Sequence, residues 1–239
     1  MTDNGWLDYW NQDDFWGIRG LWKLNARVFL RRAQGVLSWG AEDTVLDIGS
    51  GPGELAFALA EQVKSVLAVD AAPRFVEAVR ARARTAPNVA AAQLGADYTD
   101  LTVFERKFSL ILCISVIQYY RNVAEVEALI RSAQQVVRPG GRMLLADLNV
   151  RRSRTGFVYD AACSLLAGVR EGHASTLLRL AWGRWLAPCA YRRADQANRL
   201  LEFDEGEIEA LVRRMGLKAT ILRRSLSIYA NRPSLLIQF

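Results

Sequence analysis

The stretch VLDIGSGPG, residues 45–53, decides the fold expected for this chain. A short apolar run carries Asp47 near its end, Gly49, Gly51 and Gly53 follow, and the helical pattern ELAFALAEQ begins at residue 54. A glycine-rich turn between a strand and a helix lets the backbone come close to a ligand. The spacing is G-x-G-x-G, which differs from the G-x-G-x-x-G of dinucleotide sites. The segment predicts a strand–turn–helix unit with a ligand at its turn.

Strand and helix patterns alternate from this unit onward. Their order predicts strands at 44–49, 65–70, 89–95, 108–116 and 142–148, and helices at 54–62, 73–84 and 123–137, the last one stopped by Pro139-Gly140-Gly141. The apolar runs of the strands are continuous, as in parallel strands that are covered on both faces. We therefore expect an α/β fold with a doubly wound, mostly parallel sheet.

The C-terminal part completes this sheet. DEGEIEALVRRMG (204–216) predicts a helix with acidic residues in its first turn and a glycine stop. KATILRRSLSIY (218–229) and PSLLIQF (233–239) predict two strands. The three residues between them cannot form a crossover helix, so the strands must pair as an antiparallel hairpin. The sheet then has seven strands, of which the last is antiparallel.

These patterns predict a single domain over residues 1–239. Residues 1–35, rich in tryptophan, form an N-terminal helical cap, and residues 36–149 form the core with the glycine turn. Residues 150–203 interrupt the strand–helix rhythm and predict an α-helical lid insertion. Residues 204–239 return to the core with a helix and the hairpin.

Three carboxylates follow successive strands of the predicted core. Asp47 and Asp70 lie at the ends of the first two strands, and Asp97 follows the third. They suit a ligand with a positive charge, a ribose and an amino-purine, and S-adenosylmethionine has all three. Helix capping or solvated strand ends are the structural alternative. An NAD-dependent dehydrogenase is the enzymatic rival, but its glycine spacing and its Tyr-x-x-x-Lys pair are absent.

The set of motifs resembles the class I S-adenosylmethionine-dependent methyltransferases. VLDIGSGPG, LAVD (67–70), GADYTDL (95–101) and VVRPGGRMLLAD (136–147) occur in the order of that family. The resemblance implies that the ligand's methionine part lies at Asp47 and the three glycines, its ribose at Asp70, and its adenine at Asp97 and Tyr98. Ala71 and Ser115 complete the expected contacts. Ala71-Ala72 departs from the family, where a hydroxyl residue is frequent after the acid.

The stretch CISVIQYY (113–120) limits the class of molecule that we expect to accept the methyl group. This stretch lacks the Asn/Asp-Pro-Pro-aromatic turn of enzymes that methylate amino groups of bases and side chains. The chain is more similar to the ubiquinone and menaquinone methyltransferases, which implies a small apolar or amphiphilic acceptor methylated at oxygen or carbon. Tyr119 and His173, the only histidine, are the catalytic candidates. Aromatic packing for Tyr119 and a solvated loop position for His173 are their alternatives.

Aromatic residues outside the core are the candidates for the acceptor pocket. Tyr9, Trp10 and Trp16 precede the first strand, and core packing is their alternative. Trp182 and Trp185 belong to a Leu/Trp stripe at helical spacing that is flanked by arginines. Such a stripe fits a lid over an apolar pocket, a lid that also rests on an anionic membrane, or a surface for a partner protein.

Charge and cysteine content limit the partners. The net charge is +6, and residues 151–200 alone hold nine arginines against three acidic residues. This concentration differs from the diffuse basic face of a nucleic-acid enzyme, so we expect no nucleic acid partner; an RNA methyltransferase and a non-catalytic cofactor-binding scaffold are the alternatives.

Cys113, Cys163 and Cys189 lack metal-ligand spacing, so no metal is expected. Without a signal peptide or an apolar span, a cytoplasmic, at most membrane-peripheral, protein is expected. The sequence leaves the oligomeric state open.

Overall fold

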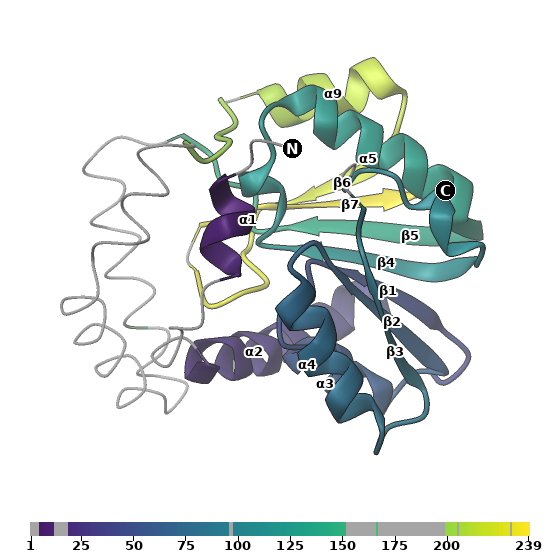
Figure 1. The fold of residues 1–239 in the computed structure, drawn as a ribbon. Helices are drawn as coiled ribbons and strands as arrows, with labels where there is room; N and C mark the ends of the chain where they lie inside the picture. The colour runs from purple at the N-terminus through teal and green to yellow at the C-terminus, as the bar shows by residue number, and fades with distance from the viewer. Residues whose placement is uncertain are drawn as a thin grey trace.

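The computed structural model describes residues 5–11, 19–95, 98–151, 166, 199–204, 206–229 and 231–239. Its centre is one seven-stranded sheet with the order β3-β2-β1-β4-β5-β7-β6 (Figure 1). Strands β1 to β5 are parallel, and β7 is antiparallel to both of its neighbours. The predicted sheet is therefore confirmed. Its strands are β1 (Thr44–Ile48), β2 (Ser65–Asp70), β3 (Val89–Gln93), β4 (Phe108–Ile114), β5 (Val137–Ala146), β6 (Lys218–Leu222) and β7 (Ser234–Gln238).

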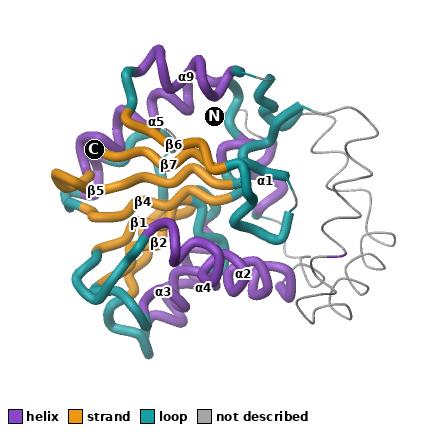
Figure 2. The backbone as a smooth tube through the Cα atoms, turned by 180° about the vertical axis from the view of Figure 1, so that it is seen from behind, coloured by secondary structure: helices purple, strands orange, loops and turns teal. Residues whose placement is uncertain are grey.

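Helices cover both faces of the sheet (Figures 1 and 2). On one face lie α2 (Arg19–Leu37), α3 (Glu54–Ala60) and α4 (Pro73–Ala83), and on the other lie α5 (Val123–Val136) and α9 (Glu207–Met215). In β4, Leu110 and Leu112 pack toward the first group, whereas Ile111 and Cys113 pack toward the second. Because successive side chains point to opposite, equally apolar layers, the apolar run is continuous along the strand.

The start of β5 differs from the prediction. Helix α5 ends at Val136 and β5 begins at Val137, so Pro139-Gly140-Gly141 lies inside the strand and is not a separate turn. The register against β4 shifts between Phe108 and Leu110 at this point. Gly140 has φ +75° and donates its amide to the carbonyl of Phe239 at 3.0 Å. Proline, which has no amide hydrogen, is tolerated here because the ladder is already irregular.

The hairpin is confirmed, but its first strand is shorter than predicted. Strand β6 ends at Leu222, and residues 223–233 connect it to β7, in place of a three-residue turn. The segment leaves the ladder because its buried polar groups bond elsewhere. Ser227 donates its amide to the Ser225 hydroxyl at 3.2 Å, and the Ile228 amide donates to the Asn25 side chain of α2 at 3.0 Å.

Both described ends of the predicted lid insertion attach to the carboxyl end of the sheet. The Arg151 amide donates to the Phe203 carbonyl and the Phe203 amide donates to the Asn149 carbonyl, each at 2.8 Å. The Leu201 amide donates to the carbonyl of Gln118 at 2.7 Å, just beyond β4. The lid itself, residues 152–165 and 167–198, lies outside the described residues. Across the described helices, none has the length and hydrophobicity needed to cross a bilayer.

Candidate active site

The glycine turn after β1 has two kinds of glycine. Gly49, Gly51 and Gly53 all have positive φ angles, of 68°, 53° and 80°. A Cβ atom on Gly49 would lie 2.3 Å from Cγ2 of Val116, and one on Gly53 would lie 2.9 Å from Cγ2 of Val79. A Cβ atom on Gly51 would meet no described atom within 4 Å. Packing within the protein therefore explains Gly49 and Gly53, whereas Gly51 faces open space that a ligand can fill.

Asp70 connects this turn to the next helix. Its Oδ2 accepts the Gly51 amide at 2.8 Å, and its Oδ1 accepts the Ala72 amide at 2.9 Å, just before α4. Burial raises the pKa of this carboxyl to about 6, although these amide hydrogen bonds oppose the shift. Each carboxylate oxygen can accept a further hydrogen bond. Asp70 can therefore hold the turn and still receive hydroxyl donors from a ribose.

Asp47 is buried beneath the same turn. Its Oδ2 has no hydrogen-bond partner among the described residues. Burial and the nearby charge of Asp70 raise its pKa to about 7. A buried, unsatisfied carboxylate is costly in free energy, and a cationic ligand would relieve that cost. An orphan carboxylate beside an open glycine thus fits the ammonium-bearing methionine part of S-adenosylmethionine.

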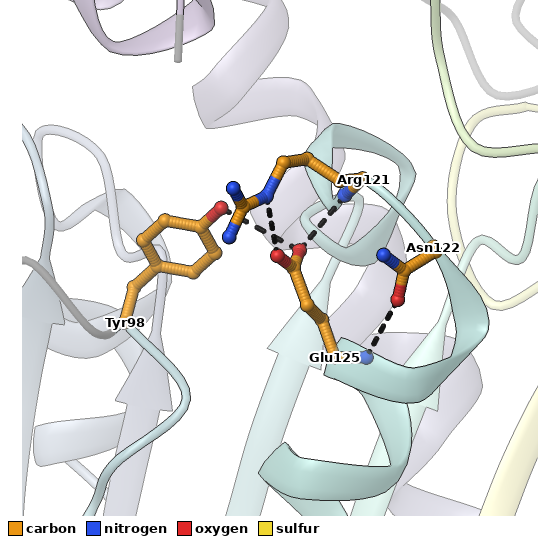
Figure 3. Close-up of polar contacts among 4 residues, drawn as sticks. All are labelled: Tyr98, Arg121, Asn122 and Glu125. Atoms are coloured by element: carbon orange, nitrogen blue, oxygen red, sulfur yellow. Dashed lines mark hydrogen bonds and ion pairs between the residues drawn. The ribbon is translucent and has the colours of Figure 1, made fainter. Parts of the chain in front are cut away.

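The loop after β3 is fastened to the start of α5 (Figure 3). The Tyr98 hydroxyl donates to Glu125 at 3.5 Å, and its ring centroid lies 5.2 Å from that of Tyr120. Glu125 also accepts the Arg121 amide at 2.8 Å, and its own amide donates to the Asn122 side chain at 3.1 Å. These contacts of Glu125 were not predicted from the sequence, although Asn-x-x-Glu before an apolar helix is a known helix-capping pattern. Glu125 holds Tyr98 on the side where the adenine is expected.

Ser115 has a protein partner in the structure. Its hydroxyl donates to Asp147, so the ends of β4 and β5 are joined by two side chains. Both residues have positive φ angles, of 58° and 63°, which is uncommon for residues other than glycine. Burial raises the pKa of Asp147, while hydrogen bonds from Ser115 and Ser227 oppose this. Asp147 was not predicted as a site residue, although it ends the motif VVRPGGRMLLAD.

Helix α1 (Gly5–Trp10) places aromatic rings over this edge of the sheet. The ring centroid of Tyr119, in the short 3₁₀ helix η2 (Ile117–Tyr119), lies 5.0 Å from that of Trp6 and 5.6 Å from that of Trp10. The ring centroids of Tyr9 and Trp10 are 5.0 Å apart. We call Trp6, Tyr9, Trp10 and Tyr119 the aromatic cluster. Trp6 was not among the predicted pocket residues, although it precedes Tyr9 and Trp10 by three and four residues.

The cluster also reaches the cofactor side. The Trp10 ring lies 6.3 Å from that of Phe75, which follows Asp70 at the start of α4. Ala71, between Asp70 and Ala72, accepts a hydrogen bond on its carbonyl from Gln93 at 3.4 Å. The structure thus brings Asp47, Asp70 and the glycine turn to the same edge of the sheet as the aromatic cluster.

Five of the predicted site residues lie outside the described part of the chain and stay predictions: Asp97, Trp16, His173, Trp182 and Trp185. Within the described part, no three His, Cys, Asp or Glu side chains come close enough together to hold a metal ion.

Known proteins resemble this chain in sequence. A family model described as a methyltransferase domain matches residues 45–141. The chain is 31% identical over 166 residues to the ubiquinone biosynthesis O-methyltransferase of Methylocella silvestris, a match covering 67% of this chain and 59% of that protein. It is 38% identical over 117 residues to the chondramide synthase cmdD of Chondromyces crocatus, covering 47% of this chain and 3% of that protein. The chain thus spans less than two thirds of the length of these relatives.

A solved structure has the same fold. The N-methyltransferase NodS of Bradyrhizobium japonicum WM9, in complex with S-adenosyl-L-homocysteine, superposes with a TM-score of 0.56 at 18% identity. The match covers 100% of this chain and 98% of that one. At this identity the likeness concerns the fold alone, and it agrees with the predicted α/β arrangement.

Proposed function

Because residues 45–141 carry a class I methyltransferase domain, as the motifs predicted, we propose that this chain transfers a methyl group from S-adenosylmethionine to a small acceptor. The observation that carries the proposal is the pairing of an orphan carboxylate oxygen on Asp47 with open space at Gly51. A site of this kind suits a ligand that brings a positive charge and needs close backbone approach.

The chain's own residues would bind the cofactor along the carboxyl edge of the sheet. Asp47 would face its ammonium group, Gly51 would leave room for its methionine chain, and Asp70 would accept hydrogen bonds from its ribose. Tyr98, with Asp97, would border its adenine. When bound, S-adenosylmethionine supplies a methyl group on a positively charged sulfur.

The chain would contribute alignment and exclusion of water to the transfer. Methyl transfer needs the acceptor atom in line with the methyl group and its sulfur, and a positioned reactant pair gains much of the rate from that geometry. The aromatic cluster covers the edge next to the cofactor-side residues. It can therefore shield the reacting atoms from water.

A small apolar or amphiphilic acceptor, methylated at oxygen or carbon, is the class that we propose. The aromatic cluster supports it, because the partly buried rings of Trp10 and Tyr119 offer an apolar surface to a ligand. The chain's likeness to a ubiquinone biosynthesis O-methyltransferase points the same way. The predicted lid tryptophans, Trp182 and Trp185, would complete the pocket, since both ends of their segment attach to this edge.

An acceptor screen tests the proposal. The protein is incubated with methyl-labelled S-adenosylmethionine and separate sets of quinols, phenols, amines and RNA. Label in quinols or phenols, at oxygen or carbon, is the expected result. Label only in amines or RNA would contradict the acceptor class, and no transfer to any set, together with no cofactor binding, would contradict methyl transfer itself.

A further inference from the structure

The connection between β6 and β7 brings a cation to the acceptor side of the site. Because β7 is antiparallel, residues 223–233 reach it at the carboxyl edge of β5, where the Leu148 amide donates to the Pro233 carbonyl at 3.0 Å. In Figure 1 this yellow segment lies at the same end of the sheet as α1. Arg232 is thus carried by a segment that the sequence predicted to be a plain hairpin turn.

Arg232 contacts η2, the short helix that also carries Tyr119 of the aromatic cluster. Its Nη1 donates to Oε1 of Gln118 at 2.6 Å, and Gln118 is buried. Its guanidinium carbon lies 5.1 Å from the ring centroid of Tyr229. The next residue in η2, Tyr119, contacts Trp6 and Trp10. One short 3₁₀ helix therefore joins a guanidinium group to an apolar aromatic wall.

Among the described residues, the acidic group that Arg232 acts on is the buried Asp147, which is also influenced by Arg32. Burial raises the pKa of Asp147, whereas both guanidinium groups oppose that shift. No ion pair within the described residues includes Arg232. Its hydrogen-bond acceptor there is a neutral amide.

We propose that Arg232 binds a carboxylate or phosphate group of the acceptor, whose apolar part lies against the aromatic cluster. A guanidinium group has five N–H donors in a planar fork that matches such anions with two parallel hydrogen bonds. The contact to Gln118 occupies Nη1 and orients the fork. The inference rests on the proposed function, and it narrows the amphiphilic acceptor to one with an anionic end.

Matched pairs of ligands test this assignment. The protein is saturated with S-adenosylhomocysteine and titrated by calorimetry with aromatic and aliphatic carboxylic acids and with phosphate monoesters. Each acid is paired with its neutral methyl ester, and each phosphate monoester with its neutral parent alcohol. The wild type should bind its best acid or phosphate about tenfold more tightly than the matching neutral compound. Arg232→Gln removes the guanidinium group but keeps a polar side chain, and it should bring the ratio for that pair close to one, whereas Arg232→Lys should keep part of the preference.

Arg223→Gln is the matched control. Arg223 lies in the same connection, but its side chain is 88% exposed and lies 4.0 Å from Glu209. This variant should keep the wild-type preference, and all variants should bind S-adenosylhomocysteine as the wild type does.

Three outcomes would overturn the assignment. If neutral compounds bind as tightly as the anions to the wild type, Arg232 recognises no anion, and methylation of those compounds would leave the proposed function standing. If Arg232→Gln keeps the preference, another residue recognises the anion. If S-adenosylhomocysteine binds but no compound of any pair does, the assignment and the proposed acceptor class are both wrong.

Discussion

The Asp70 carboxylate accepts the Gly51 amide at 2.8 Å, across the two strand ends where the cofactor is proposed to bind. The hydrogen bond couples the acid expected at the ribose to the one glycine of the turn that faces open space. Asp70 therefore has a structural role before any ligand arrives. Substitutions at Asp70 and Gly51 should separate that role from ligand binding.

Asp70→Ala should weaken binding of S-adenosylhomocysteine by roughly 1.5–3 kcal/mol, because a charged acceptor for the ribose hydroxyls is removed. The affinity of Asp70→Asn for S-adenosylhomocysteine should lie between those of Asp70→Ala and the wild type, since the side-chain amide oxygen still accepts one backbone amide hydrogen bond. Titration calorimetry measures both. Equal affinity in the wild type and Asp70→Ala would show that the carboxylate does not contact the ligand.

Gly49→Ala and Gly51→Ala should differ in thermal stability. Both place a side chain at positive φ, which costs on the order of 1–2 kcal/mol. Only Gly49→Ala also brings its Cβ to 2.3 Å from Val116, so it should lose more stability. Differential scanning calorimetry of the ligand-free proteins tests this contrast. Equal losses would mean that the space at Gly51 is filled in solution.

Cofactor affinity should rise with pH between about 5.5 and 7.5. Asp47 and Asp70 have pKa values raised to about 7 and about 6, and a cationic ligand prefers their ionised forms. Binding therefore strengthens as each carboxyl loses its proton. Asp47→Asn should flatten the upper part of this profile. A profile that is flat in the wild type would contradict the proposed contact of Asp47 with the ammonium group.

The ligand-free protein should show the opposite trend. Burial in the folded state raises the pKa of Asp47 from its ordinary value of 3.8 to about 7, so the folded state binds more protons than the unfolded state between these values. The contribution of Asp47 to stability therefore falls as the pH rises from about 4 to about 7. Urea unfolding of the wild type and Asp47→Asn across this range measures it. A stability difference between the two proteins that does not change with pH would contradict the raised pKa.

Trp10→Ala should raise the KM for the acceptor and change cofactor affinity little, because Trp10 is only partly buried and lies in the aromatic cluster. Trp6→Ala should instead destabilise the fold, by about 3–5 kcal/mol if the gap stays open, since Trp6 is only 2% exposed. Steady-state kinetics and urea unfolding measure the two effects. If Trp10→Ala leaves acceptor kinetics unchanged, the aromatic cluster serves packing alone.

Much of this fold could be predicted because the core signals are local. The continuous apolar run of β4 and the glycine stop at Gly216 each follow from one physical rule about burial or backbone conformation. The prediction that the strand continues over residues 223–229 was wrong, because a local pattern misled it. The segment's alternating serines and apolar residues imitate a strand, but Ser225 and Ser227 are buried and bond to each other.

The site was less predictable where distant contacts decide it. Nothing local in the sequence shows that Ser115 and Asp147 take positive φ angles and meet across two strand ends. Arg232 is separated from Gln118 by 114 positions, so their contact depends on the complete sheet. Asp47 and Asp70, by contrast, follow directly from strand ends and the glycine turn.

Titration of S-adenosylhomocysteine into the wild type and Gly51→Val, side by side, tests the central claim most directly. The wild type should bind one equivalent, and the variant should bind none while keeping the wild-type circular dichroism spectrum, because its side chain fills the open space at the turn. Absence of binding by the wild type, or equal binding by a folded Gly51→Val, would contradict the proposed cofactor site.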